Sequence, residues 1–274
     1  MTKRRYLKEA EESYNSLKFS DDFLFCKILT ENEELTKELL ELILGIKIGK
    51  VEVRKQEGIT PTADGRGIRL DVYAKDDENK VFDVEMQTTR KKNLPKRSRY
   101  YQGMMDLNLL KRGEDFQELK ESYVIFICMN DPFPGYDRYI YTFETICKEE
   151  SGLFLGDGTC KVFLNANGTK GEASDGLKDF LHLLKNGYGK SRLVKEIEKE
   201  VIEANKNEKW RLEYMTLYMR DMEKREEGRE EQKVNAIMNA LKKGYSITVA
   251  ADILGCTVEE AQKIADEHLA VPVK

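Results

Sequence analysis

The chain has 274 residues, of which 40% are hydrophobic and 35% are charged, and its formal net charge is -4. It is too apolar for a disordered chain, and its length predicts two domains or one elaborated α/β domain with a tail. The mildly acidic balance means that any binding of a polyanion must come from a local basic patch. Only 2 histidines are present, which disfavours histidine-based zinc and iron sites, so a metal site would use oxygen ligands.

The five cysteines are scattered and form no Cys-x-x-Cys pair. This spacing argues against a disulfide framework or a zinc knuckle and predicts a reducing compartment. Acidic residues follow the N-terminus where a secretory signal would need an apolar run, and no segment approaches the roughly 18 apolar residues of a membrane span. We therefore expect a cytoplasmic protein with no membrane partner.

Two helices are predicted at the start of the folded region. The first begins near Ser20, which is a possible N-cap, and the second covers residues 33–44 and stops at Gly45. A short strand at 50–54 and a loop over 58–67 are expected next. The chain then changes from a helical period to a strand period.

Two runs of alternating apolar and polar residues predict a β-hairpin. They cover residues 68–74 and 81–87 and are separated by a polar turn. A turn centred on Glu78 places Asp71 directly opposite Glu85, with both side chains on the same face. The hairpin therefore predicts two facing carboxylates.

The segment after the hairpin is basic over residues 90–99 and leads into a helix that starts at Pro95 and reaches about 112–113. Residues 123–129 form an apolar run typical of a strand buried on both faces after a helical crossover. Two further short strands are expected, at 139–143 and 161–164. This order predicts an α/β fold with a mixed central sheet flanked by helices.

From Ser174 onward the pattern is helical, with a break at 186–189 and a long charged helix over 190–233. A small three-helix pattern with helix-turn-helix-like spacing follows. Its third helix is acidic, with Glu259 and Glu260 in the first turn, and acidic helices repel phosphate. We therefore expect this part to contact protein, with homo-oligomerisation through the C-terminal helices as one possibility, in preference to reading a DNA sequence.

Two facing carboxylates repel each other unless a cation neutralises them. A divalent ion such as Mg²⁺ takes oxygen ligands, often one or two carboxylates together with water and a substrate phosphate, and Asp71 with Glu85 supplies that minimum. Gln87 projects on the same face and could orient a water molecule. Arg97 and Arg99 follow closely and offer phosphate contacts. Acids, a metal and nearby cations together indicate phosphodiester hydrolysis.

These residues resemble a known family, the Rpn recombination-promoting nucleases and putative transposases of the PD-(D/E)XK superfamily. The resemblance covers roughly residues 20–131 and the helical tail. It is carried by Asp22-Phe23-Leu24-Phe25, Arg69-Leu70-Asp71-Val72-Tyr73, Glu85-Met86-Gln87, Lys96-Arg97 and Tyr100-Tyr101-Gln102. It implies a restriction-endonuclease-like core with an all-α C-terminal extension, and a metal-dependent DNA endonuclease associated with recombination or mobile elements.

The resemblance also implies roles for individual residues. Asp71, Glu85 and the main-chain carbonyl of Met86 would hold Mg²⁺, or alternatively Mn²⁺ or Ca²⁺. Asp22 would be a further acid from the first helix, and Gln102 would be a helix residue beside the site. DNA is the implied partner.

One position departs from the superfamily pattern. Gln87 stands where a Lys is usual, and an amide cannot bring positive charge to the nucleophile, so Arg97 is a candidate replacement. Lys96, Arg99 and Tyr101 are expected, together with Arg97, to contact DNA phosphates.

The sequence leaves simpler alternatives open. Asp71 and Glu85 could be solvated acids on a strand face, and Asp22 could be an ordinary charge at a helix start. Tyr101 could be a core residue, and Gln102 an ordinary surface residue. At the level of function, the alternative is a catalytically inactive nuclease fold that binds DNA or protein. Hydrolysis and strand transfer also stay undistinguished.

The predicted domain organisation has four parts. Residues 1–19 form an N-terminal extension, residues 20–188 the nuclease-like domain, residues 189–233 a long charged helical linker, and residues 234–274 the small helical unit.

Overall fold

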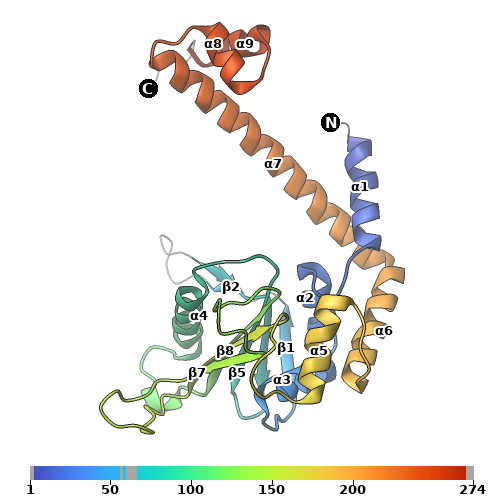
Figure 1. Ribbon diagram of the computed structural model, residues 1–274, viewed down its shortest axis with the longest axis vertical. Helices are drawn as coiled ribbons and strands as arrows, with labels where there is room; N and C mark the ends of the chain where they lie inside the picture. The colour runs from blue at the N-terminus through green and yellow to red at the C-terminus, as the bar shows by residue number, and fades with distance from the viewer. Residues whose placement is uncertain (1–2, 56–57, 60–66, 270–274) are drawn as a thin grey trace. The chain divides into compact units, whose positions relative to one another are not determined.

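The computed structural model describes residues 3–55, 58–59 and 67–269 (Figure 1). It contains two compact units, which are described separately below. We call Ser16–Glu208 the sheet unit, and Met1–Asn15 together with Lys209–Lys274 the helical unit. None of the described helices is both long enough and apolar enough to span a membrane.

The sheet unit begins with two helices, α2 (Asp22–Glu31) and α3 (Glu33–Leu44). Both were predicted, but Ser20 is not the N-cap of the first, because α2 starts at Asp22 with Asp21 in the N-cap position. Gly45 ends α3 with a φ of 68°, a left-handed conformation that glycine adopts without steric cost.

Six strands form a mixed sheet in the order β1-β4-β5-β6-β8-β7, which confirms the predicted fold class. Strand β4 pairs antiparallel with both β1 and β5, whereas β5, β6 and β8 run parallel to one another, and the edge strand β7 is antiparallel to β8. The strands are β1 (Val51–Lys55), β4 (Val72–Asp76), β5 (Val81–Gln87), β6 (Ser122–Cys128), β7 (Ile140–Phe143) and β8 (Thr159–Asn165).

The register of the β4–β5 hairpin is the predicted one. Val72 pairs with Val84 and Tyr73 pairs with Asp83, so the same register places Asp71 opposite Glu85. The two acids therefore meet at the end of the hairpin that is farthest from its turn.

The predicted strand over 68–74 is not continuous. Residues Ile68–Arg69 form a separate strand, β3, which pairs with β2 (Gly58–Ile59) in a two-stranded sheet. The chain leaves this small sheet before β4 begins, so Asp71 lies just outside regular strand pairing. The loop predicted over 58–67 lies largely outside the described residues.

Helices cover both faces of the central sheet. Helix α4 (Leu94–Leu109) lies on one side, and α3 and α5 (Asp175–Asn186) lie on the other, with α6 (Arg192–Lys206) packed against α2, α3 and α5 (Figure 1). Helix α4 ends before the predicted 112–113, and a short 3-10 turn, η1 (Phe116–Glu118), follows it. Because β5 lies between β4 and β6 and beneath α4, all seven of its residues are buried.

The helical unit contains α1 (Lys3–Asn15), α7 (Glu208–Lys242), α8 (Ile247–Leu254) and α9 (Val258–Leu269). The single helix predicted over 190–233 is wrong, because the chain breaks at Asn207 between α6 and α7. Helix α1 was not predicted. It packs against α7 through Tyr14, whose ring centroid lies 5.6 Å from that of Tyr214.

Candidate active site

The central strand β5 carries a row of polar side chains into the interior. Strand alternation puts Asp83, Glu85 and Gln87 on the same face of β5. Asp83 is 0% exposed and Glu85 is 3% exposed. The interpretation of Glu85 as a solvated strand-face acid is therefore wrong, because this face lies in the interior of the sheet unit.

Asp71 and Glu85 are held together through the backbone. The Asp71 N–H donates to Glu85 Oε1 at 3.1 Å, and the Met86 N–H donates to Asp71 Oδ2 at 3.3 Å. The Glu85 carboxylate thus accepts a hydrogen bond from the backbone of Asp71, and the Asp71 carboxylate accepts one from the residue after Glu85. This reciprocal arrangement fixes both carboxylates at one end of the hairpin.

Arg97 enters the site from the first turns of α4. Its guanidinium donates to Glu85 Oε2 at 3.0 Å, to Gln87 Oε1 at 2.9 Å and to the Tyr101 hydroxyl at 2.9 Å. It also lies 5.2 Å from the ring centroids of both Tyr101 and Phe126. Arg97 is therefore a partly buried cation held by acid, amide and aromatic groups, and its predicted phosphate contact stays a prediction.

The Gln87 side chain is fully engaged by protein. Its Nε2 donates to the Thr89 carbonyl at 2.8 Å, and its Oε1 accepts from Arg97. The amide oxygen of Gln87 is therefore bonded to Arg97, and the amide nitrogen is bonded to the backbone that follows β5. The predicted role of Gln87 in orienting a water molecule stays a prediction.

Helix α2 brings two more groups to the acids. Asp22 is exposed and Cys26 is buried, and they stand one helical turn apart. The ligand atoms of Asp22, Cys26 and Asp71 all lie within 4.8 Å of one another. The structure thus unites the predicted acid Asp22 with Asp71, and it adds a thiol that was not predicted.

The remaining predicted residues are divided between the surface and the interior of α4. Lys96 and Arg99 are exposed and have no ion pair within the part of the chain that the structure describes. Tyr101 is half-buried and packs near Phe126. Gln102 does not reach the acids, because its amide donates to the Ser122 hydroxyl at the far end of β6.

Burial and mutual repulsion raise the pKa values of the clustered acids. Burial, followed by the charge of Asp22, raises the pKa of Asp71 to about 7. Burial, followed by the charge of Asp71, raises the pKa of Glu85 to about 8. Burial and then Glu85 raise the pKa of Asp83 well above its usual range. Without a bound cation, the cluster therefore retains protons near neutral pH.

These shifts predict how the stability of the ion-free protein depends on pH. The folded pKa values of Asp71 and Glu85 lie above the unfolded values of about 4, so the folded state binds more protons between those limits. We expect the free energy of unfolding in EDTA to rise by at least about 1 kcal/mol as the pH falls from 8 to 6. Urea denaturation at each pH measures this free energy of unfolding.

Glu41 and Asp179 have lowered pKa values, so both are ionised throughout this pH range and do not change the dependence of the free energy of unfolding on pH.

A double variant, Asp71→Asn with Glu85→Gln, is the matched control for this measurement. It removes two of the three acids with raised pKa values and should reduce the slope of the curve between pH 6 and 8, with Asp83 left as the remaining raised acid of the cluster. A free energy of unfolding that increases with pH in the wild-type protein over this range would contradict the expected charge state of the acids.

Two groups in the cluster were missed from the sequence, although each left a signal. Asp83 alternates with Glu85 and Gln87 in the same strand run, but only the position of β5 inside the sheet makes it buried. Neither carboxyl oxygen of Asp83 has a hydrogen-bond partner among the residues that the structure describes. Cys26 follows Asp22 at a spacing of four in a predicted helix, which already placed both on one face.

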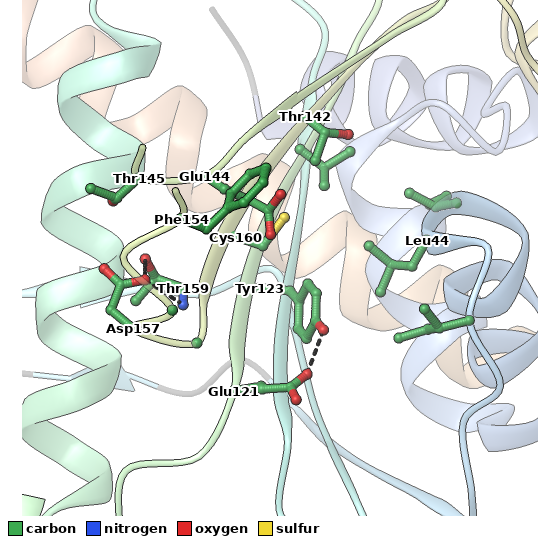
Figure 2. Close-up of a pocket in the computed structure, with 15 residues that line it drawn as sticks. Leu44, Glu121, Tyr123, Thr142, Glu144, Thr145, Phe154, Asp157, Thr159 and Cys160 are labelled. Carbon is green, nitrogen blue, oxygen red and sulfur yellow. Dashed lines mark hydrogen bonds between the residues drawn. The ribbon is translucent and has the colours of Figure 1, made fainter. Parts of the chain in front are cut away.

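The hollow shown in Figure 2 lies away from this cluster. It measures about 490 Å³ and is lined by Tyr123, Glu121 and Cys160, among others, but by none of the predicted site residues. Tyr123 stacks on Phe82 at a centroid distance of 5.2 Å, and Phe82 projects from the opposite face of β5 to Glu85. The hollow is therefore separate from the acids.

A family model described as PD-(D/E)XK nuclease family transposase matches residues 20–243. The chain belongs to this family. The match spans the mixed sheet, the helices on both of its faces and all of α7, so it agrees with the observed architecture. No curated protein and no solved structure matches the chain.

Membership of a PD-(D/E)XK nuclease family supports a nuclease-like function, and nucleases of this type generally use divalent metal ions. The residues present fit such an ion. Asp71 and Glu85 offer carboxylate oxygens, the ligands that Mg²⁺ prefers. The buried carboxyl of Asp83 has no hydrogen-bond partner within the described part of the chain, and the nearby charges of Glu85 and Asp71 add to burial in raising its pKa. A bound divalent cation would stabilise the ionised form of all three carboxyl groups.

Proposed function

We propose that this protein is a Mg²⁺-dependent DNA endonuclease that hydrolyses phosphodiester bonds, with a role in DNA recombination or mobile elements. The observation that carries the proposal is the pair Asp71 and Glu85, aligned by reciprocal backbone hydrogen bonds inside a sheet of the family's type. Aligned carboxylates cost stability when no cation neutralises them, so their arrangement favours a functional origin.

In this proposal, Asp71, Glu85 and the main-chain carbonyl of Met86 hold the ion. Bound there, Mg²⁺ would polarise the phosphate and lower the pKa of a water molecule. Asp22, exposed beside Asp71, adds negative charge on the solvent side of the same cluster. The protein thereby supplies oxygen ligands in fixed positions, with one side of the cluster open to solvent.

Arg97 supplies the positive charge that Gln87 cannot. The guanidinium orients Glu85 and Gln87 together, and its stacking between two aromatic rings keeps it in place. Lys96 and Arg99, exposed on the same turn of α4, are the proposed DNA phosphate contacts. Arg97 therefore organises the acids, while its exposed neighbours bind the substrate.

One observation favours a second candidate, a nuclease fold that binds DNA or protein without cutting it. The Gln87 amide occupies the usual Lys position, and its hydrogen bonds to Thr89 and Arg97 lock it in place. In this candidate, binding would need no metal and would survive loss of Glu85. The two candidates therefore differ in a measurable way.

The test is cleavage of supercoiled plasmid by the purified full chain in Mg²⁺, Mn²⁺, Ca²⁺ or EDTA. We expect nicked and then linear DNA with Mg²⁺ or Mn²⁺, and intact plasmid in EDTA. Gel-shift binding on the same DNA separates the candidates. DNA that is bound but uncut under every ion would overturn the nuclease proposal and favour the binding protein.

A further inference from the structure

Helix α2 presents a thiol and a carboxylate to the end of the β4–β5 hairpin. Asp22 and Cys26 lie on one face of α2, and Asp71 reaches them from the segment before β4. The Cys26 Sγ and one carboxylate oxygen from each acid lie within 4.8 Å of one another. Three groups from two separate parts of the chain therefore converge on one point.

The surroundings of Cys26 are unusual for a structural cysteine. Cys26 is 6% exposed, and its thiol makes no hydrogen bond with any residue that the structure describes. A buried cysteine usually acts as a small apolar group among apolar neighbours. Cys26 instead faces Asp22 and Asp71, and burial together with the charge of Asp71 raises the pKa of its thiol. The thiol is thus an unpartnered buried polar group aimed at two carboxylates.

The neighbourhood is short of positive charge. Among the described residues, Arg69 and Arg97 are the cations that lower the pKa of Asp71. Arg97 is already bonded to Glu85, Gln87 and Tyr101, so it is not available to the Asp22 side of the cluster. Arg69 is exposed on β3 and acts on both Asp22 and Asp71. On the Asp22 side of the cluster, the one positive charge of Arg69 faces two carboxyl groups and a thiol, all of which become negative when they ionise.

We propose that Asp22, Cys26 and Asp71 form a second metal site, which binds a thiophilic divalent ion of the Zn²⁺ and Co²⁺ class in preference to Mg²⁺ or Ca²⁺. A thiolate is a soft ligand and selects such ions, whereas carboxylates and water suit Mg²⁺ and Ca²⁺. When the ion binds, a sulfur–metal bond forms and the thiol proton passes to solvent. The inference extends the proposed function, because Asp71 would serve both sites.

The test is a Co²⁺ titration of the full chain, stripped of metal and free of DNA. Thiolate ligation gives a sulfur-to-cobalt charge-transfer absorbance in the near ultraviolet. We expect a saturable band in the wild-type protein, and we expect Cys26→Ser to lose it. Cys160→Ser is the matched control, because Cys160 lies elsewhere in the sheet unit on β8 and should leave the band intact.

A second variant protects the test against misfolding of Cys26→Ser. Asp22 is exposed, so Asp22→Asn should fold, and we expect it to weaken Co²⁺ binding about tenfold or more. Circular dichroism checks the fold of both variants. An unchanged Co²⁺ affinity in Asp22→Asn, or a band that persists in folded Cys26→Ser, would overturn the second site.

The outcome can be separated from that of the proposed function. Wild-type protein that cuts DNA with Mg²⁺ but shows no thiolate band loses the second site and keeps the nuclease. If the wild-type protein shows the band, Cys26→Ser lacks it and no DNA is cut, the second metal site is supported and the nuclease proposal is overturned.

Discussion

Replacing Glu85 by Gln is expected to reduce Mg²⁺-dependent DNA cleavage by about 10³-fold, which corresponds to about 4 kcal/mol of transition-state stabilisation. The amide keeps one acceptor oxygen, so it can retain the hydrogen bond from the Asp71 N–H or the one from Arg97, but not both, and the ligand charge is lost. The strand pairing of β4 with β5 does not depend on this side chain and should survive. Asp71→Asn should produce a loss of similar size. Initial nicking rates at saturating Mg²⁺, measured on supercoiled plasmid, test both variants.

The matched control is Glu78→Gln in the turn of the same hairpin. The Glu78 side chain is 70% exposed and forms a surface ion pair with Lys80 at 3.0 Å, so its loss should change neither cleavage nor stability appreciably. If Glu85→Gln is folded and cleaves DNA as fast as Glu78→Gln, then Glu85 has no role in cleavage.

Arg97→Ala should destabilise the ion-free protein by about 2 kcal/mol, because the charged hydrogen bonds to Glu85 and Gln87 are lost and Glu85 must take up a proton to avoid an unpaired charge. The Glu85 side chain is 4% exposed and lies 3.0 Å from Arg97, and the same substitution frees the amide of Gln87. Arg97→Lys should lose less, since an ammonium keeps the charge but not the planar fork. Urea denaturation in EDTA at pH 8 measures these differences.

Two comparisons make the Arg97 prediction specific. Arg99→Ala removes an exposed arginine from the same helix turn and should change stability by less than about 0.5 kcal/mol. The Arg97→Ala deficit should also shrink toward pH 6, because Glu85 then takes up a proton and needs the cation less. If Arg97→Ala and Arg99→Ala lower the free energy of unfolding equally, then the pairing of Arg97 with Glu85 does not stabilise the fold.

The hairpin shows what local sequence pattern can predict. Alternation and a single polar turn were enough to pair the strands in the correct register, because a one-residue slip would have moved every apolar side chain to the wrong face. The facing position of Asp71 and Glu85 followed from that register. The mixed sheet followed from the order of helices and strands.

The environment of the site could not be derived in the same way. Whether Asp83 and Glu85 face water depends on strands and a helix that are remote in sequence, and these set the burial of β5. Arg97 was grouped with its basic neighbours as a phosphate contact. Its spacing of four from Tyr101 indicated a shared helix face, but only the packing of α4 on β6 shows that this face points inward.

The pairing of α1 with α7 has a consequence for biosynthesis. The Ser13 and Tyr214 hydroxyls are 2.7 Å apart, yet the residues are separated by 201 positions. At roughly 5–20 residues per second, a ribosome needs roughly 10–40 seconds to deliver the partner of α1 after making the helix itself. During that interval Tyr14, which is buried in the finished protein, lacks its contact with the Tyr214 ring of α7. Helix α1 can therefore complete its packing only after α7 has been made, and its apolar side chains are open to chaperones until then.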